Sequence, residues 1–341
     1  MSDQPRRAIA EAIADHGPIP FSEFMELALY GPDGFYERPP IGSGEDSAFV
    51  TSPHVHPVFG QLLAAGLLEL WDALGRPKPF RVTEVGAGDG TLARQLLDAL
   101  AEVRTEYAAV ERSSGARDAL AQIAALEVRE RVGGDPHVVL MNELLDNLPF
   151  RRFRGDHEIL VGLDGDRFVE TGHGDAGDDR DGETLAPEGA LAFVDELSSA
   201  LDRGYALLID YGGSEGPGGP THGYRGHRIV EDVLQDPGNS DITAGVDFGL
   251  IARRAREHGL VAHADVSQHD ALMALGLERW IRDELAQQAQ MLDERRGLDA
   301  VRTWSGRSRA TLLADPAALG RLRWMLLSTP GLAAPSWLRA P

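Results

Sequence analysis

Three closely spaced glycines form the most distinctive chemical motif of this 341-residue sequence. They lie in the segment 84–90, which reads EVGAGDG, after a short apolar run and before a helical pattern. Glycine permits tight turns and lets backbone amides approach a ligand that a β-carbon would keep away. The start of the helix adds free N–H donors and a partial positive charge. Gly86, Gly88 and Gly90 are therefore predicted to hold a nucleotide-like cofactor.

Two glutamates flank this glycine loop and narrow the class of cofactor. A dinucleotide-binding loop has the spacing G-x-G-x-x-G and binds a pyrophosphate, whereas the third glycine here comes one residue earlier. Glu84 would repel a pyrophosphate but suits a ligand with an ammonium and a sulfonium group. Glu111, 21 residues after Gly90, can accept hydrogen bonds from both ribose hydroxyls. The pair favours S-adenosyl-L-methionine over a nicotinamide cofactor; the alternative is a strand-to-helix turn with two incidental acids.

Further polar residues follow two other expected strands. Asn142, Glu143 and Asp146 come after the third strand, and Asp210 and Tyr211 after the fourth. Ligands gather at the carboxyl ends of parallel strands, so Asn142 is expected near the cofactor and the other four near the acceptor. A helical turn would place Glu143 and Asp146 on one face, where they could orient an acceptor nitrogen. The alternatives are a helix cap by Asn142 with solvated acids, and a strand-end turn with a buried tyrosine.

Three other polar side chains are weaker candidates. Asp247 could bind an acceptor or cap the helix that follows it. His54 and His56 lack an evident third ligand, so no metal site is predicted. The sequence has no cysteine, which excludes disulfides and thiolate zinc sites.

Helices and strands alternate in the segments that must position these residues. Apolar periodicity predicts helices over 4–16, 21–29, 59–74, 91–102, 115–125, 248–258 and 270–292, and strands over 80–85, 107–111, 137–142 and 205–211. A hairpin is expected from strands at 158–163 and 167–171, loops at 172–183 and 214–226, and either a strand or a helix at 321–328. The alternation indicates an α/β fold with a parallel, doubly wound sheet.

The chain length calls for a core with additions. We expect an N-terminal helical and lid segment at 1–78, a cofactor-binding core at 79–268 with insertions at 150–200 and 213–245, and a C-terminal helical region at 269–341. The turn-rich stretch 30–52 is the candidate lid.

Composition restricts the class of protein and of partner. The net charge of −21 argues against a nucleic-acid-binding surface, which needs clustered basic residues. No apolar run is long enough to predict a transmembrane helix. The first 16 residues resemble neither a secretory signal nor a transit peptide, so a cytoplasmic location is expected.

Several segments, taken in their order along the chain, resemble the MidA-like family of class I S-adenosylmethionine-dependent methyltransferases. These segments are 28–36 (ALYGPDGFY), 49–53 (FVTSP), 142–149 (NELLDNLP), 209–212 (IDYG) and 241–248 (DITAGVDF), besides the glycine loop. The family includes a mitochondrial complex I assembly factor that methylates an arginine. The resemblance therefore implies a Rossmann-like fold, S-adenosylmethionine as cofactor and an arginine-containing acceptor protein. The family's tyrosine pair reads Phe35-Tyr36 here. Methylation of a small molecule and a cofactor-binding assembly module without turnover remain the alternatives.

Overall fold

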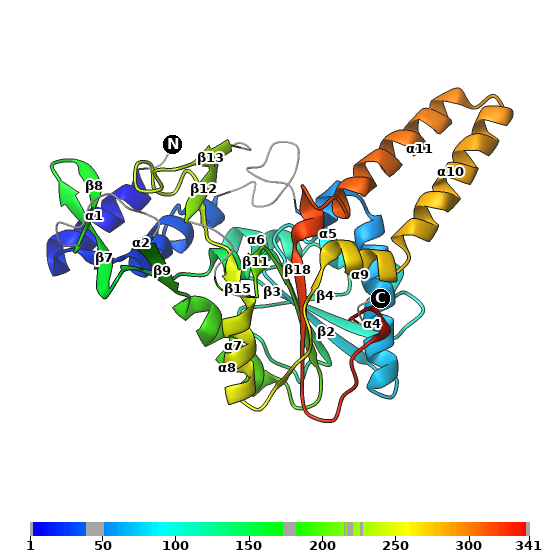
Figure 1. Cartoon of the computed structure of the whole chain (residues 1–341), viewed down its shortest axis with the longest axis horizontal. Helices are drawn as coiled ribbons and strands as arrows, with labels where there is room; N and C mark the ends of the chain where they lie inside the picture. The colour runs from blue at the N-terminus through cyan, green and yellow to red at the C-terminus, as the bar shows by residue number, and fades with distance from the viewer. Residues whose placement is uncertain are drawn as a thin grey trace.

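A central sheet of eight strands forms the core of the protein (Figure 1). The computed structural model describes residues 3–38, 51–172, 182–214, 216, 221–225 and 228–338. In spatial order the strands are β16 (Val261–Ala262), β18 (Arg323–Ser328), β10 (Tyr205–Asp210), β5 (Val138–Asn142), β2 (Phe80–Val85), β3 (Thr105–Val110) and β4 (Leu126–Arg129), and β17 (Val266–Ser267) also pairs with β18. The five strands from β10 to β4 pair in parallel, whereas β18 runs antiparallel to β10.

The central strands are buried because helices cover both faces of the sheet. Successive residues of β5 alternate between two clusters: Val138 packs with α4 (Val58–Ala73), α5 (Thr91–Ala99) and α9 (Gln268–Ala274). Val139, on the opposite face, packs with α7 (Glu188–Ala200) and α8 (Phe248–Glu257). A further helix, α6 (Ser114–Leu120), packs beside β4 at the edge of the sheet.

The observed sheet confirms the α/β class and corrects two details of the expectation. The parallel arrangement ends at β18, because the segment 321–328 is a strand that enters the sheet in the opposite direction. The C-terminal region, expected to be helical, thus contributes a strand to the core. The strand β4 had no counterpart in the sequence prediction, since three of its residues are half-buried, Glu127 is exposed, and the four lack a clear apolar pattern.

A second, smaller module packs the N-terminal helices against the first insertion. It contains α1 (Gln4–His16), β1 (Ile19–Pro20), α2 (Phe21–Met25), η1 (Glu26–Tyr30), β6 (Arg151–Arg154), β7 (His157–Asp164), β8 (Arg167–Thr171) and β9 (Glu183–Ala186). Phe21, Phe24, Phe150 and Phe168 share its apolar core. The predicted hairpin is confirmed as β7 and β8. The continuous helix predicted over 21–29 changes from α to π geometry at Glu26.

The two predicted loops have different outcomes. Most of 172–183 lies outside the described residues. The stretch 214–226 contains a strand rather than only a loop, since β12 (His222–Arg225) pairs with β13 (Arg228–Val230) and β14 (Asp241–Thr243). Much of the candidate lid at 30–52 also lies outside the described residues, apart from Tyr30 to Arg38 and the two residues that lead into α3 (Ser52–Val55).

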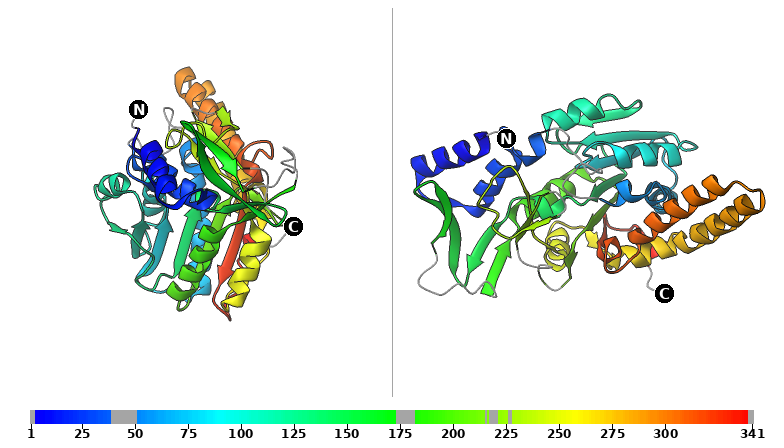
Figure 2. Two further views of the ribbon diagram at one scale, coloured as in Figure 1. Left: turned by 90° about the vertical axis from the view of Figure 1, so that its left-hand side faces the viewer. Right: turned by 90° about the horizontal axis from the view of Figure 1, so that it is seen from above.

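A helical hairpin projects from the end of the molecule that lies opposite the N-terminal helices (Figure 2). It consists of α10 (Leu277–Asp293) and α11 (Gly297–Ala310). The single helix predicted over 270–292 is divided into α9 and α10 by Gly276, whose φ of +105° interrupts the helix. Among the described residues, no helix combines the length and apolarity needed to cross a membrane.

Candidate functional site

The glycine loop after β2 has the backbone geometry that only glycine adopts freely. Gly86, Gly88 and Gly90 have φ angles of +73°, +55° and +75°. A β-carbon on Gly86 would lie 2.9 Å from Cδ1 of Leu144, whereas one on Gly88 would meet nothing within 4 Å. The open space beside Gly88 is therefore a cradle that a side chain would fill, at the start of α5.

Glu111 lies directly against this loop, at the end of β3. One of its carboxylate oxygens, Oε2, accepts a hydrogen bond from the backbone N–H of Gly88 (3.0 Å). The other accepts from the amides of Arg112 (2.7 Å) and Ser113 (3.1 Å). Burial raises the pKa of Glu111, and these hydrogen bonds only partly offset that effect. A carboxylate has further lone pairs, so this fixed group can still accept from a diol.

Glu84 is buried, with 3% of its surface exposed, at the base of the loop. The Tyr107 hydroxyl donates a hydrogen bond to its Oε2 at 2.7 Å. Burial raises the pKa of Glu84 to about 8, and the hydrogen bond from Tyr107 lowers it only in part. A carboxyl group held this way gains strongly from a neighbouring cation.

The loop after β5 separates the two carboxylates that the sequence placed on one helical face. Glu143 has a left-handed φ of +55°, and the short 3-10 turn η3 (Leu145–Asn147) begins only after it. Oε1 of Glu143 accepts from the amide of Ser52 and from Nδ2 of Asn142, both at 3.1 Å. Asp146 instead accepts from the Thr243 hydroxyl at 2.6 Å. The prediction that Glu143 and Asp146 share a helical face was therefore wrong. The alternative prediction, a helix cap by Asn142, was also wrong, because Asn142 ends a strand.

Asp210 anchors this loop from the end of β10. Its Oδ2 accepts from the backbone N–H groups of Leu144 (3.0 Å), Leu145 (2.7 Å) and Asp146 (3.4 Å). Burial raises the pKa of Asp210 to about 7 even though these amides favour the charged form. Tyr211, the next residue, lies under the guanidinium of Arg321, and burial raises its pKa above the ordinary range.

Tyr30, Tyr36 and Asp241 join the site from distant parts of the chain and meet Asn147 of the loop after β5. The Tyr36 hydroxyl donates to Asp241 at 2.8 Å, and Nδ2 of Asn147 donates to the same carboxylate at 3.0 Å. Tyr30 stacks on Tyr36 with ring centroids 5.4 Å apart and donates to the carbonyl of Asn147. Tyr36, Asn147 and Asp241 lie within the family-like segments but were not predicted individually as site residues. The signal that could have identified them is the presence of Tyr30 and Tyr36 in one such segment and of Asn147 and Asp241 in two others.

Two buried oxygens of the loop have no hydrogen-bond partner: Oδ1 of Asn142 and Oδ1 of Asp146. Asp146 also lines a pocket of about 470 Å³, counted with its open mouth, whose other walls are mainly apolar. Those walls come from the segments 145–150 and 244–247 and from β9, α7 and α8, and they include Leu148, Leu185 and Ala190. Asp247, at the pocket edge, caps α8 by accepting from the amide of Leu250 at 2.8 Å.

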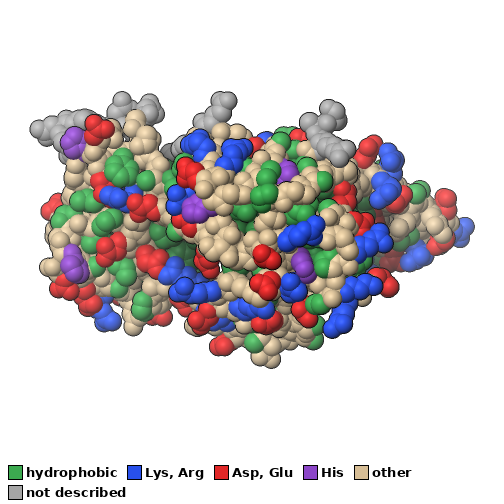
Figure 3. Space-filling model, turned by 90° about the horizontal axis from the view of Figure 1, so that it is seen from below, with side chains coloured by type: hydrophobic (Ala, Val, Ile, Leu, Met, Phe, Trp, Pro, Cys, Tyr) green, Lys and Arg blue, Asp and Glu red, His purple; other side chains and the backbone are tan. Residues whose placement is uncertain are grey.

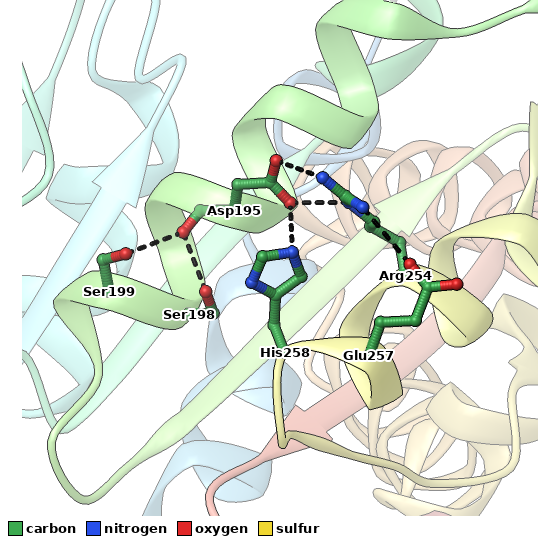
Figure 4. A network of polar contacts seen from close by, with 6 residues as sticks. All are labelled: Asp195, Ser198, Ser199, Arg254, Glu257 and His258. Carbon is green, nitrogen blue, oxygen red and sulfur yellow. Dashed lines mark hydrogen bonds and ion pairs between the residues drawn. The ribbon is translucent and has the colours of Figure 1, made fainter.

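A polar network holds α7 and α8, which form these walls, together (Figure 4). Asp195 of α7 accepts from Nε and Nη2 of Arg254 in α8, at 2.7 and 2.6 Å. His258, just after α8, lies 3.0 Å from the same carboxylate. The paired, bidentate geometry fixes the spacing of the two helices.

The histidines predicted not to bind metal have other partners. Nε2 of His54 lies 2.9 Å from Oδ2 of Asp89 in the glycine loop. His56 packs edge-on against Trp280. Within the described ranges, no group of three or more histidine or acidic side chains could hold a metal ion.

These features fit S-adenosyl-L-methionine, which needs acceptors for a ribose and an ammonium group. An open glycine cradle, a fixed carboxylate beside it and an unpartnered amide oxygen on Asn142 supply them. Gly88 and Glu111, both predicted to bind the cofactor, lie in direct contact. The position of Glu84 below the loop, hydrogen-bonded to Tyr107, was not predicted.

Comparisons with known proteins agree with this assignment. The profile of a family of S-adenosyl-L-methionine-dependent methyltransferases matches residues 62–266. The human mitochondrial protein arginine methyltransferase NDUFAF7 is 28% identical over 331 aligned positions, which cover 80% of this chain and 73% of the relative. The Drosophila melanogaster homologue is 25% identical and covers 94% and 84% of the two chains.

A solved structure extends the similarity over nearly the whole chain. It is a superfamily member from Burkholderia thailandensis bound to S-adenosyl-homocysteine, with 27% identity, a TM-score of 0.77, and coverage of 98% of this chain and 95% of the other. The resemblance to MidA-like proteins is thereby confirmed. This chain belongs to the family of S-adenosyl-L-methionine-dependent methyltransferases and has the class I methyltransferase fold.

Proposed function

We propose that this methyltransferase modifies an arginine side chain of a partner protein. The acidic character of the region behind the cofactor loop supports an acceptor with a positive charge. Glu143, Asp146, Asp210 and Asp241 all have raised pKa values, in each case because burial penalises the carboxylate. For Glu143, Asp146 and Asp210 the repulsion of neighbouring acids adds to this effect. An entering guanidinium would relieve both effects.

The observation that carries the proposal is the buried Oδ1 of Asp146, which lies beside a mainly apolar pocket and receives no hydrogen bond from an N–H or a hydroxyl group, while the Asp146 carboxyl group itself neighbours that of Asp210. A buried acceptor without a donor is costly, so it suggests a ligand that completes it. Arginine combines an apolar three-carbon stem with a planar group of five N–H donors. Its stem would contact Leu148 and Leu185, and its guanidinium would donate to Asp146.

The cofactor, when bound, supplies a methyl group on a positively charged sulfur. We assign its ribose to Glu111 and the amide of Gly88, and its amino-acid end to Glu84 and Asn142. The acceptor nitrogen gains the methyl group and loses a proton. We assign Glu143 to accept that proton, since burial raises its pKa to about 8, close to the range required of a general base at neutral pH.

The test combines methyl transfer with product analysis. The purified protein is incubated with methyl-labelled S-adenosylmethionine and a lysate of cells that lack it, and labelled proteins are hydrolysed to amino acids. Methylated arginine is the expected product. Label on another amino acid would contradict the proposal, label confined to small molecules would favour the small-molecule alternative, and cofactor binding without any label would favour an assembly module.

A conservative variant tests the role of Asp146. Asp146→Asn keeps the shape and the hydrogen bond from Thr243 but removes the charge. A hydrogen bond to a charged group contributes about 1.5–3 kcal/mol, so methylation should fall roughly 10- to 150-fold while cofactor affinity is unchanged. Asp283→Asn, on the exposed side of α10, is the matched control. Full activity of Asp146→Asn would remove the basis for the arginine assignment.

A further inference from the structure

A chain of buried polar groups connects Glu143 with the C-terminal part of the protein. Ser52 and Gln268 are both 0% exposed, and the Ser52 hydroxyl lies 3.1 Å from Nε2 and 3.3 Å from Oε1 of Gln268. The backbone N–H of Ser52 donates to Oε1 of Glu143 at 3.1 Å. These groups lie inside the protein, in contrast to the acidic and basic side chains that intermingle on its surface (Figure 3). Ser52 thus contacts Glu143 with its backbone and Gln268 with its side chain.

The orientation of the Gln268 amide group is fixed by two further partners. Gln268 begins α9, and its Nε2 donates to the carbonyl of Leu313 at 2.9 Å. Its Oε1 accepts from Nε1 of Trp324 at 3.2 Å. If the amide group were turned over, its NH2 would face an indole N–H and its oxygen would face a carbonyl, so two donors and two acceptors would meet. Gln268 therefore presents its amide group to Ser52 in a single orientation.

The position of Ser52 depends on such contacts because α3, which it begins, is a single turn of four residues. A helix this short is not stable alone, so neighbouring elements must hold it in place. The carbonyl of Pro53 accepts from Nε2 of Gln95 in α5 at 2.8 Å. The side chain of Ser52 is held by Gln268 in α9. Gln268 therefore helps to fix the backbone N–H that Ser52 directs at Glu143.

The hydrogen bond from Ser52 distinguishes the two carboxylate oxygens of Glu143. Both hydrogen bonds that the described residues donate to this carboxylate, from Ser52 and from Asn142, fall on Oε1. Two N–H donors stabilise negative charge on that oxygen and disfavour a proton there. The hydrogen bond from Ser52 accordingly lowers the pKa of Glu143, against the larger effect of burial. A proton that reaches Glu143 is therefore directed to Oε2.

We propose that Gln268 is a positioning residue for methyl transfer, which acts through Ser52 on Glu143. By holding Ser52, it keeps a backbone N–H on Oε1 of Glu143 and leaves Oε2 to take up the proton. The acceptor nitrogen gains the methyl group as the carbon–sulfur bond breaks with its electron pair left on sulfur, and the proton of that nitrogen passes to Oε2. This inference rests on the proposed role of Glu143 as proton acceptor but not on arginine as the acceptor.

The ionisable groups around Glu143 belong to other elements than Ser52 and Gln268. Asp146 faces it from its own loop, and Asp210 and Tyr211 face it from the end of β10. Neither α3 nor α9 contributes an ionisable side chain to this contact, since serine and glutamine remain neutral. Substitutions of Ser52 and Gln268 therefore leave the charges around Glu143 unchanged and alter only the hydrogen bond.

Carbon-13 NMR of protein labelled at Cδ of glutamate measures the pKa of Glu143 directly. The signal of Glu143 is identified by its absence from Glu143→Gln. Ser52→Ala removes the hydroxyl group, and Gln268→Met keeps the length of the side chain without its amide. Each should free the Ser52 N–H from Oε1 and raise the pKa of Glu143, by about 1–2 pH units if the hydrogen bond is lost completely. If Gln268→Met does not fold, Ser52→Ala alone decides.

Ser328→Ala is the matched control for these variants. Ser328 is also 0% exposed and hydrogen-bonded, with its hydroxyl 2.9 Å from Nε2 of His263, but it has no contact with Glu143. Its substitution should leave the pKa of Glu143 unchanged. An unchanged pKa in Ser52→Ala, or an equal rise in Ser328→Ala, would overturn the proposal.

Methyl transfer from labelled S-adenosylmethionine to the proteins of the lysate tests the consequence for catalysis. The low-pH limb of the initial rate should move upward in Ser52→Ala and Gln268→Met, while the KM for the cofactor is unchanged. The double variant should behave like Gln268→Met, because both substitutions break the same path. Additive effects would show that Gln268 does not act through Ser52.

The variant Glu143→Gln separates failure of this inference from failure of the proposed function. Full activity of Glu143→Gln would refute the assignment of Glu143 as proton acceptor. Loss of activity in Glu143→Gln, together with an unchanged pH profile in Ser52→Ala, would overturn the role of Gln268 alone.

Discussion

Replacing Glu84 by glutamine should make the protein less sensitive to alkaline pH. The folded-state pKa of Glu84 is raised from an ordinary 4.5 to about 8, mainly by burial. The protonated form therefore stabilises the folded state fully below pH 4.5, and this contribution is lost as pH rises through about 8. Glutamine can still accept the Tyr107 hydrogen bond and never ionises.

The magnitude follows from the linkage between protonation and folding. Each pH unit between the two pKa values costs about 1.4 kcal/mol of unfolding free energy. Between pH 5 and pH 8 the wild-type protein should lose about 4 kcal/mol through Glu84 that Glu84→Gln retains. Because any fixed cost of the new amide is the same at both pH values, it cancels in this difference. Glu143, Asp210 and Asp241 titrate in both proteins and cancel as well.

Urea unfolding at pH 5 and pH 8 measures this difference. Parallel calorimetry should show that cofactor binding near pH 8 releases protons in the wild-type protein and fewer in Glu84→Gln, because an ammonium beside Glu84 lowers its pKa. A difference below about 1 kcal/mol between the two proteins would refute the burial argument. Unchanged proton release would refute the role of Glu84 in cofactor binding.

Three further substitutions test the supports of the site. Gly86→Ala should destabilise the protein by about 1–3 kcal/mol and weaken cofactor binding, because the φ of Gly86 is +73° and Cδ1 of Leu144 lies 2.9 Å from the new β-carbon. Thermal unfolding should show a smaller loss of stability for Gly17→Ala, since the φ of Gly17 is +81° but nothing lies within 4 Å of its β-carbon position. Asp210→Asn should turn an N–H group toward backbone donors, cost about 2–3 kcal/mol and accelerate amide hydrogen exchange at 144–146; unchanged exchange there would contradict the anchoring role. His54→Phe removes a hydrogen bond to Asp89 and should weaken cofactor binding about 2- to 12-fold, with the exposed His16→Phe as control; equal affinities in calorimetry would exclude this contribution.

The parts of the site that could be predicted from the sequence are those that depend on neighbouring residues. A buried strand, a glycine loop and a second strand ending in Glu111 follow from local apolar patterns and turn chemistry. The contact between Gly88 and Glu111 then follows from the pairing of adjacent parallel strands.

The remaining parts depend on contacts that local patterns do not encode. The left-handed φ of Glu143 turns its side chain toward Ser52, so spacing along a helix could not place it. Tyr36 and Asp241 are 205 positions apart and meet only when the N-terminal segment packs against β14. The expected domain boundaries and cytoplasmic location stay predictions.

The antiparallel strand β18 has a consequence for the order in which the chain acquires structure during synthesis. β10 ends at residue 210, but its partner begins at residue 323. A ribosome adding 5–20 residues per second needs roughly 5–20 seconds to make the intervening chain. Throughout that time the hydrophobic edge of β10 lacks a neighbour, and an unpaired edge readily recruits other strands. The nascent protein should therefore depend on chaperones most strongly in this interval, well after its glycine loop has been made.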